Sequence, residues 1–191
     1  MLQYPESKFI LDKLTNELAP HLYYHSVKHT LDVYERAAYM AAKENVNPED
    51  IKLLLIAALY HDSGYLYQSA GHEDISCKIA TDVLPDFGYN PDDIEKICRI
   101  IIATKLPQDP HSKLEEIICD ADLDYLGRDD FFDTGHGLYL EMLAAGKVAD
   151  EKEWNVLQID FLEQHHYFTT TAKLLRDKKK QENLTILLSK I

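Results

Sequence analysis

The stretch IKLLLIAALYHD, residues 51–62, decides the fold of this protein. It is apolar on nearly every face of a helix, which predicts a central, buried helix. Pro48 precedes it and is followed by two acidic residues, a pattern typical of a helix start because these side chains suit the positive end of the helix dipole. Gly64 is a natural residue just beyond a helix C-terminus, so the helix is expected to end near Asp62.

Outside this stretch, apolar residues recur at helical spacing, and no pair of alternating segments is joined by an Asn-Gly or Asp-Gly turn. Prolines and glycines separate about eight or nine segments, each of which is expected to be a helix. The sequence therefore predicts an all-α helical bundle, formed by a single domain over residues 1–191. The last forty or so residues, with Trp154, Phe161 and Phe168, are expected to close the core.

Composition sets limits on the kind of protein. Of the 191 residues, 46% are hydrophobic and 28% are charged, which excludes disordered, collagen-like and low-complexity classes. Counting 20 basic and 33 acidic residues gives a formal net charge of −13, which disfavours binding to nucleic-acid polymers and to membrane surfaces. Three cysteines without CxxC spacing, and a start MLQYPESKF that does not resemble a signal peptide, lead us to expect a cytoplasmic protein.

His25 and His29 are the first candidate functional pair. They are four residues apart, so on a helix they would share one face, where two imidazoles can converge on one divalent ion. Pairs of this kind also occur on plain surfaces.

His61 and Asp62 stand at the end of the most hydrophobic predicted helix. A charged carboxylate and an imidazole there are costly to bury unless they are paired or coordinated. The unpaired carbonyls and the negative end of the dipole favour a cation at this position. Neighbouring residues diverge by about 100° on a helix, but both can reach one ion at a frayed last turn.

Three aspartates follow in the segment CDADLDYLG, residues 119–127. Helical geometry places Asp120 and Asp124 on one face and Asp122 on the roughly opposite face, so a single site can use only one set. Periodicity does not choose between them, although Asp122 lies nearest to the apolar side. All three could also be solvated surface acids; if Asp122 faces inward, it requires a partner, which a metal held with His29 and His61 would supply.

The order of these residues resembles the H…HD…D pattern of the HD-domain superfamily of metal-dependent phosphohydrolases. The likeness covers roughly residues 24–127 and extends to the local contexts HTLDV, AALYHDSG and DADLDYLG. The resemblance implies an all-helical bundle in which residues 24–127 form the motif core and the C-terminal helices, residues 129–191, complete the bundle. It implies the metal ligands His29, His61, Asp62 and Asp122, because the family ligand is the Asp that follows Ala in such a segment.

The segment HSVKH, residues 25–29, further resembles the HNxxH motif of the cyclic-nucleotide phosphodiesterase branch, with Ser26 where that branch has Asn. In that motif the first histidine donates a proton to the leaving oxygen, so the resemblance makes His25 a candidate general acid. The alternative for His25 is a solvent-exposed histidine at a helix N-terminus.

Some members of the superfamily hold two metals through two further histidines. This chain has His72 in GHEDISCKIA, but Thr104 and Lys105 stand where the second histidine is expected. An ammonium there would occupy the charge space that a second divalent ion needs, so a single metal is predicted. His72 and Lys105 would then face a substrate phosphate; the alternative for Lys105 is a cation stabilised by a helix C-terminus.

These observations predict an enzyme that hydrolyses a small phosphate ester, with nucleotides among the candidates, using water activated by one divalent metal. Mixed N and O ligands suit Mn, Fe, Co, Ni or Zn, and also allow Mg. Asp62 is the expected base and His25 the acid, and Lys28 and Lys105 would attract the anionic substrate. The alternatives are an oxygen-activating di-iron oxidoreductase, which needs a second set of metal ligands, and a non-catalytic nucleotide-sensing module. A homodimer could form through an exposed apolar helix face.

Other polar residues carry weaker expectations. Asp120 and Asp124 are expected to lie behind the ligands or on the surface, and His165 to serve in core packing or on the surface. The sequence contains no segment that identifies the leaving group.

Overall fold

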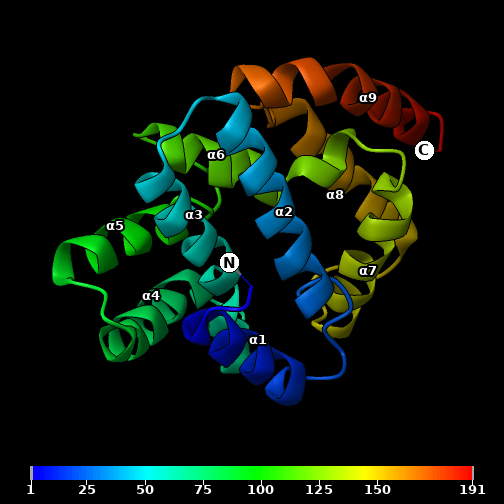
Figure 1. The fold of residues 1–191 in the computed structure, drawn as a ribbon. Coiled ribbons are helices and arrows are strands. Elements are labelled where there is room, and N and C mark those ends of the chain that lie inside the picture. The colour runs from blue at the N-terminus through cyan, green and yellow to red at the C-terminus, as the bar shows by residue number, and fades with distance from the viewer. Residues whose placement is uncertain (1, 191) are drawn as a thin grey trace.

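A computed structural model describes residues 2–190, and this part of the chain contains helices and no strand (Figure 1). The prediction of an all-α fold is confirmed. The nine α-helices are α1 (Pro5–Glu17), α2 (Val27–Lys43), α3 (Pro48–Tyr60), α4 (His72–Val83), α5 (Pro91–Ile102), α6 (Lys113–Asp122), α7 (Phe131–Ala144), α8 (Glu151–Gln164) and α9 (Thr170–Leu188). Three 3-10 helices join them, η1 (Ser63–Leu66), η2 (Leu84–Phe87) and η3 (Asp124–Gly127).

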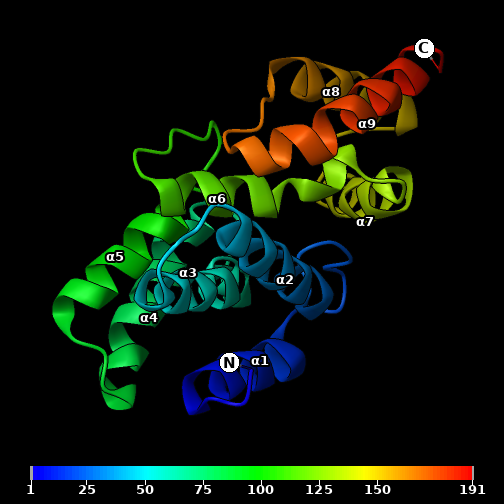
Figure 2. The same ribbon diagram turned by 45° about the horizontal axis from the view of Figure 1, so that its top comes forward.

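The central helix is α3, as predicted. Every residue from Leu53 to Tyr60 is buried, and α2 and α5 pack closely against the helix. Its start is fixed by Asn47, whose side-chain oxygen accepts a hydrogen bond from the backbone N–H of Asp50 at 2.9 Å. The buried length of α3 makes it the support on which the surrounding helices are placed (Figure 2).

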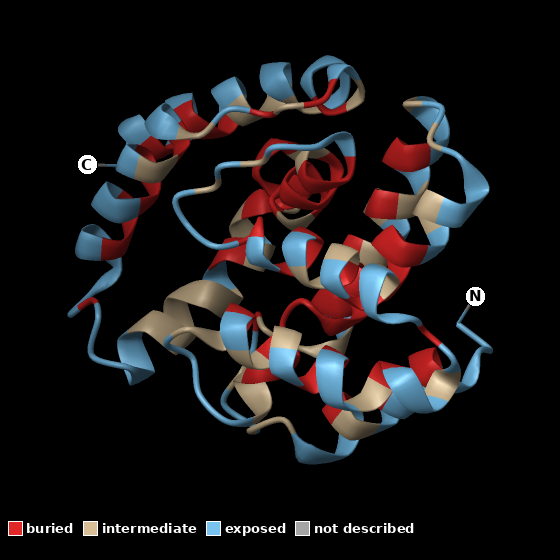
Figure 3. Ribbon diagram, turned by 90° about the vertical axis from the view of Figure 1, so that its left-hand side faces the viewer, coloured by how far each residue is buried: buried red, intermediate tan, exposed pale blue. Residues whose placement is uncertain are grey.

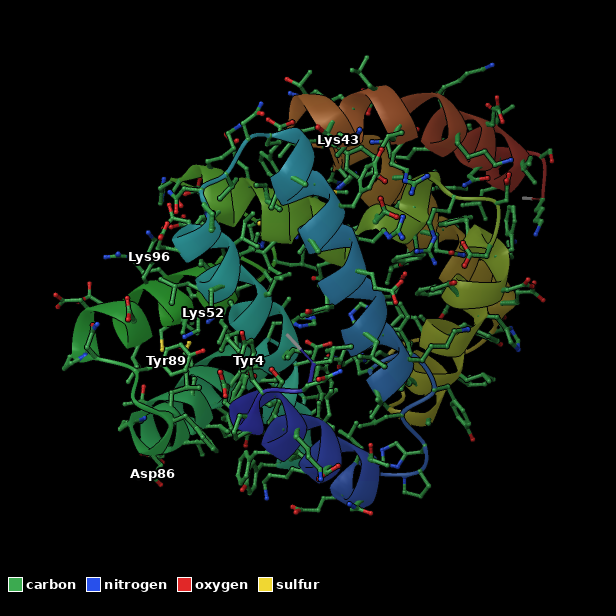
Figure 4. The ribbon with its side chains drawn as sticks, viewed as in Figure 1. Tyr4, Lys43, Lys52, Asp86, Tyr89 and Lys96 are labelled. Atoms are coloured by element: carbon green, nitrogen blue, oxygen red, sulfur yellow. The ribbon has the colours of Figure 1, made fainter. Side chains whose placement is uncertain are left out.

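Helix α1 is tied to this centre by Glu6. The hydroxyl of Tyr60 donates to the Glu6 carbonyl at 3.1 Å, and the hydroxyl of Tyr89 donates to the Glu6 carboxylate at 2.9 Å. On the outer side, the Lys52 ammonium lies 4.6 Å from the centre of the Tyr89 ring (Figure 4). These contacts join α1, α3 and the loop before α5.

Helix α9 covers the other side of the bundle with a buried stripe turned inward (Figure 3). It is anchored by Arg176, whose Nε and Nη2 donate to the two carboxylate oxygens of Asp124 at 2.7 and 2.9 Å. Asp120 accepts hydrogen bonds at 2.8 Å from the backbone N–H groups of Phe168 and Thr169, just before α9. Both aspartates are fully buried, so the alternative in which all three aspartates are solvated is wrong.

The same packing requires a glycine at position 127. A Cβ atom there would lie 2.6 Å from the backbone oxygen of Arg176, which is far inside contact distance. The close approach of η3 to α9 is therefore possible only without a side chain.

None of the helices formed by residues 2–190 is long and apolar enough to span a bilayer.

His165 lies between α8 and α9 and gives the fold a pH dependence. Burial, helped by the nearby Lys180 ammonium, lowers the pKa of His165 from 6.5 to about 3. Lys180 also donates to the backbone carbonyl of His165. Between pH 6.5 and 3 the unfolded chain therefore holds a proton that the folded chain excludes, and folding is weakened as pH falls.

We expect the free energy of unfolding to fall below pH 6.5 more steeply in the wild type than in His165→Gln, by up to about 1.4 kcal/mol per pH unit. Urea denaturation at pH 5.0, 5.5, 6.0 and 6.5 measures the two slopes. Because the variant keeps every other titrating group, the difference isolates this side chain. Parallel slopes would contradict the burial of a neutral imidazole here.

Candidate metal centre

Three helices deliver the predicted ligands to one place. His29 lies in the first turn of α2, His61 and Asp62 follow the last residue of α3, and Asp122 is the last residue of α6. Helix α2 packs against both α3 and α6. The C-terminal ends of α3 and α6 meet the N-terminal turn of α2, where His29 lies close to Asp62 and Asp122. Because these helix ends are buried, the side chains of His29, His61 and Asp62 face one another instead of the solvent.

The ligand atoms are close together. His29 Nε2 lies 3.0 Å from Asp122 Oδ1 and 3.3 Å from Asp62 Oδ2. His61 Nε2 lies 3.3 Å from Asp62 Oδ2 and 3.5 Å from Asp122 Oδ1. One ligand atom each from His29, His61 and Asp122 lies within 4.8 Å of the others, which is the spacing of a metal site.

The hydrogen bonds indicate which atoms are available to a cation. His61 Nδ1 donates to the Ala58 carbonyl at 2.8 Å, so in the neutral ring Nε2 carries the free lone pair. Within residues 2–190, His61 Nε2 and Asp62 Oδ2 are buried without any hydrogen-bond partner. Unsatisfied buried polar atoms are costly, and a divalent cation between two imidazoles and two carboxylates would satisfy both of them. The residues therefore fit such an ion.

The charges at the site are strongly coupled. Burial alone would lower the pKa of His29, but its hydrogen bond to the Asp122 carboxylate and the nearby negative charge of Asp62 raise it to about 9. Burial would raise the pKa of Asp122, but the two imidazoles lower it to about 2. A cation that binds here replaces the His29 proton, so its affinity should decrease as the pH falls.

His25 is placed differently from the prediction. Helix α2 begins at Val27 with Ser26 as its N-cap, so His25 precedes the helix and does not share a helical face with His29. The reason is a carboxylate from α7: Glu141 Oε1 accepts hydrogen bonds from the backbone N–H groups of Tyr24 and His25, at 2.6 and 3.0 Å. Its Oε2 lies 2.5 Å from His25 Nδ1, which fixes the ring.

Tyr65 connects His25 to the metal centre. Its hydroxyl lies 2.9 Å from His25 Nε2, and the two rings stack with centroids 3.9 Å apart. The Tyr65 ring also contacts the ring of His72, with centroids 4.3 Å apart, and His72 Nε2 lies 3.2 Å from Asp62 Oδ1. Burial and the surrounding carboxylates, Asp62 first among them, raise the pKa of Tyr65, so this phenol stays protonated.

Sequence reasoning missed both Tyr65 and Glu141. Tyr65 directly follows the Ser63-Gly64 turn, and its position close behind the His61-Asp62 pair is a local signal that could have singled it out. Glu141 lies 116 residues from His25, inside an apolar helix, and has no local signal.

A cavity of about 380 Å³ opens beside the cluster. His25, Asp62, Asp122, His72 and Lys105 line it. The ammonium of Lys105 also lies 3.4 Å from Asp74 at the exposed rim. Lys28, by contrast, is exposed and lines a separate groove with Arg128.

Gly64 has another role than the predicted helix cap. Helix α3 ends at Tyr60, and Gly64 lies inside η1 without a positive φ angle. A Cβ atom at this position would lie 2.0 Å from the backbone oxygen of His72, and the Gly64 N–H donates to Ser76 Oγ at 2.8 Å. The glycine lets η1 touch the start of α4, which brings His72 to Asp62.

We expect Gly64→Ala to lower the free energy of unfolding by about 2 kcal/mol or more, because backbone atoms must move to admit the methyl group. Gly135→Ala is the matched control. There the nearest atom is the flexible end of Gln158, at 3.1 Å, and the helical position favours alanine, so a change within about 1 kcal/mol is expected. Urea denaturation in the presence of a chelator compares the two; equal stability would contradict the close approach.

The helical fold and the two-histidine, two-aspartate cluster define a class of protein, that of helical domains with a buried cluster able to hold a divalent metal. A family model described as the HD domain matches residues 27–124. The chain therefore belongs to the HD-domain family, as the sequence resemblance predicted.

Two solved structures share this fold. One is described as a predicted HD superfamily hydrolase from an uncultured Thermotogales bacterium, with 20% identity, 99% of this chain and 91% of that chain covered, and a TM-score of 0.61. The other is Bacillus subtilis YpgQ in complex with ADP, with 16% identity, 96% and 94% covered, and a TM-score of 0.66. No curated protein matches the chain significantly.

Proposed function

We propose that this protein is a metal-dependent phosphohydrolase that cleaves a small phosphate ester with activated water. The observation that carries the proposal is the meeting of His29, His61, Asp62 and Asp122, with His61 Nε2 and Asp62 Oδ2 buried and unpaired beside an open cavity. A divalent cation held by these four residues would lower the pKa of a bound water molecule and would neutralise negative charge on the phosphate.

Asp62 can act both as a ligand and as a base because its two oxygens have different surroundings. Oδ2 faces His29 and His61, while Oδ1 faces the cavity side and lies 3.2 Å from His72 Nε2. We assign Oδ2 to the cation and Oδ1 to the proton of the attacking water. His72 holds Oδ1 in place, and hydrogen bonding to Asp62 offsets the effect of burial and raises the pKa of His72.

His25 is the proposed acid for the leaving oxygen. Glu141 Oε2 holds Nδ1 of the ring, and Nε2 lies 2.9 Å from the hydroxyl of Tyr65, which lines the same cavity. General acid catalysis requires a proton donor in hydrogen-bond reach of the substrate, and His25 lines the cavity that would hold it.

Lys105 would contact the substrate phosphate. Thr104 and Lys105 line the same cavity as Asp62 and Asp122, and by the sequence resemblance they stand where a second histidine ligand is expected. An ammonium there favours an anionic substrate over a second cation and so favours one metal over the di-iron alternative. Lys28 lies in the separate groove and would add only long-range attraction, which the net charge of −13 otherwise opposes.

Nucleotides are one class of candidate substrate. A neighbour of the same fold, YpgQ, was crystallised with ADP. The cavity of about 380 Å³ is within the ordinary size range of small-molecule sites.

The proposal is tested by metal analysis of the purified protein, followed by hydrolysis assays with Mn, Fe, Co, Ni, Zn and Mg. The substrates are mono-, di- and cyclic phosphates of nucleosides together with simple alkyl phosphates. We expect about one cation per chain and metal-dependent release of phosphate or of a monoester. Two irons with oxygen consumption would favour the oxidoreductase, and metal binding with no hydrolysis of any ester would favour a sensor.

A further inference from the structure

The cavity has a second, apolar part that the metal cluster does not explain. Its lining beyond the cluster comes from η3, α7 and α8, which lie together on one side of α2 in Figures 1 and 2. We call this part the apolar chamber and define it by six side chains that line it: Leu126, Phe131, Leu138, Met142, Trp154 and Leu162.

Incomplete packing of α7 creates the chamber. This helix reads FFDTGHGLYLEMLA, yet only Phe131 and Gly135 are buried in it. Leu138 and Met142 are partly exposed and line the cavity, and Leu138 also packs against the buried cluster that contains Phe131. An apolar wall beside a few polar groups is typical of a small-molecule site.

The chamber is continuous with the proposed reaction site. Leu123 and Tyr125 line the same cavity directly after Asp122, and Met142 directly follows Glu141, the residue that holds His25. A molecule whose phosphate contacts the metal cluster therefore has its organic part next to the chamber.

We propose that the apolar chamber selects the organic half of the substrate, so that the protein prefers phosphate esters with an uncharged, apolar alkyl or aryl group over polar sugar or glycerol phosphates. This inference rests on the proposed phosphohydrolase function and adds its substrate class. The physical basis is the transfer of apolar surface from water, which strengthens binding by about fourfold for each fully buried methylene.

The chain offers a direct probe of occupancy. Trp154 is its single tryptophan and lines the chamber, so its fluorescence reports binding without catalysis. We would titrate the metal-loaded protein with methyl, butyl and hexyl phosphonate, and separately with 1-hexanol. Hexyl phosphonate has five more methylene groups than methyl phosphonate, so we expect it to bind up to about a thousandfold more tightly, and we expect hexanol to change the emission.

Polar substitutions test the wall itself. Leu138→Asn keeps a similar side-chain size, and Met142→Gln is a second variant that keeps the unbranched shape if the first fails to fold. Both should reduce the preference for hexyl over methyl phosphonate by about tenfold. Leu143→Asn is the matched control, since Leu143 is 39% exposed on the same helix and does not line the cavity; it should leave the preference unchanged.

Kinetics with straight-chain alkyl phosphates complete the test, because their leaving groups differ little in reactivity. We expect KM to fall from methyl to hexyl phosphate while kcat changes less. Equal binding of methyl and hexyl phosphonate, with no response to hexanol, would overturn the inference. Tight binding of hexyl phosphonate without hydrolysis of any ester would overturn the proposed function and leave the chamber as a binding site.

Discussion

His61→Ala should leave a protein that retains no stoichiometric metal and hydrolyses phosphate esters at least about a thousandfold more slowly than the wild type. The imidazole is fully buried, its Nε2 has no hydrogen-bond partner among residues 2–190, and it faces two carboxylates. Removing it takes away a proposed ligand and leaves those carboxylates facing each other with less positive charge between them.

The measurement is metal content by mass spectrometry together with kcat/KM under saturating metal. His111→Ala is the control, because His111 is exposed and does not line the cavity beside the cluster. This variant should keep both its metal content and its kcat/KM. Circular dichroism and thermal unfolding check that the variant folds. Asp122→Asn, which keeps the shape of the side chain, provides a second variant if His61→Ala is unstable. Full activity in either metal-free variant would refute the proposed metal site.

The second large effect concerns His25, and it should depend on the leaving group. We expect His25→Ala to lower kcat for an alkyl phosphate by about 10² to 10⁴-fold, the ordinary range for loss of a general acid. For p-nitrophenyl phosphate the loss should be small, because this leaving group departs without a proton.

The contrast between the two substrates separates catalysis from structural damage. A variant that merely disturbs the site would lose activity towards both substrates alike, and that result would remove His25 from the role of acid. Tyr65→Phe is the matched control: it removes the hydroxyl 2.9 Å from His25 Nε2 but keeps the stacked ring, so a smaller loss is expected.

Local signals in the sequence account for the starts of several helices. Asn47, Asn90 and Ser112 accept hydrogen bonds from the backbone at the starts of α3, α5 and α6, and this capping chemistry acts over three residues. The continuous apolar run of α3 marks it as the central helix for a similar reason, since a helix that is apolar on every face must be buried. The sequence also separated Asp122 from Asp120 and Asp124, because helical geometry places them on opposite faces.

Periodicity could not say which face of that segment meets the histidines. The answer came from the family resemblance, and the structure shows the packing behind it: α2 and the end of α3 lie on the Asp122 side, while the segment leading into α9 binds Asp120 and Arg176 of α9 binds Asp124. The buried state of Asp124 depends on Arg176, which is 52 residues away.

The sequence by itself determined the helical class, the start of α3 and the residue types able to bind a divalent cation, because each depends on interactions within a few residues. Only the tertiary structure decided that His25 precedes α2 and is bound there by Glu141. It also decided that position 64 must be glycine, because the backbone of His72 lies against it, and that an apolar chamber lies beside the metal cluster. These features depend on contacts between segments far apart in the chain, and no local pattern of side chains encodes such contacts.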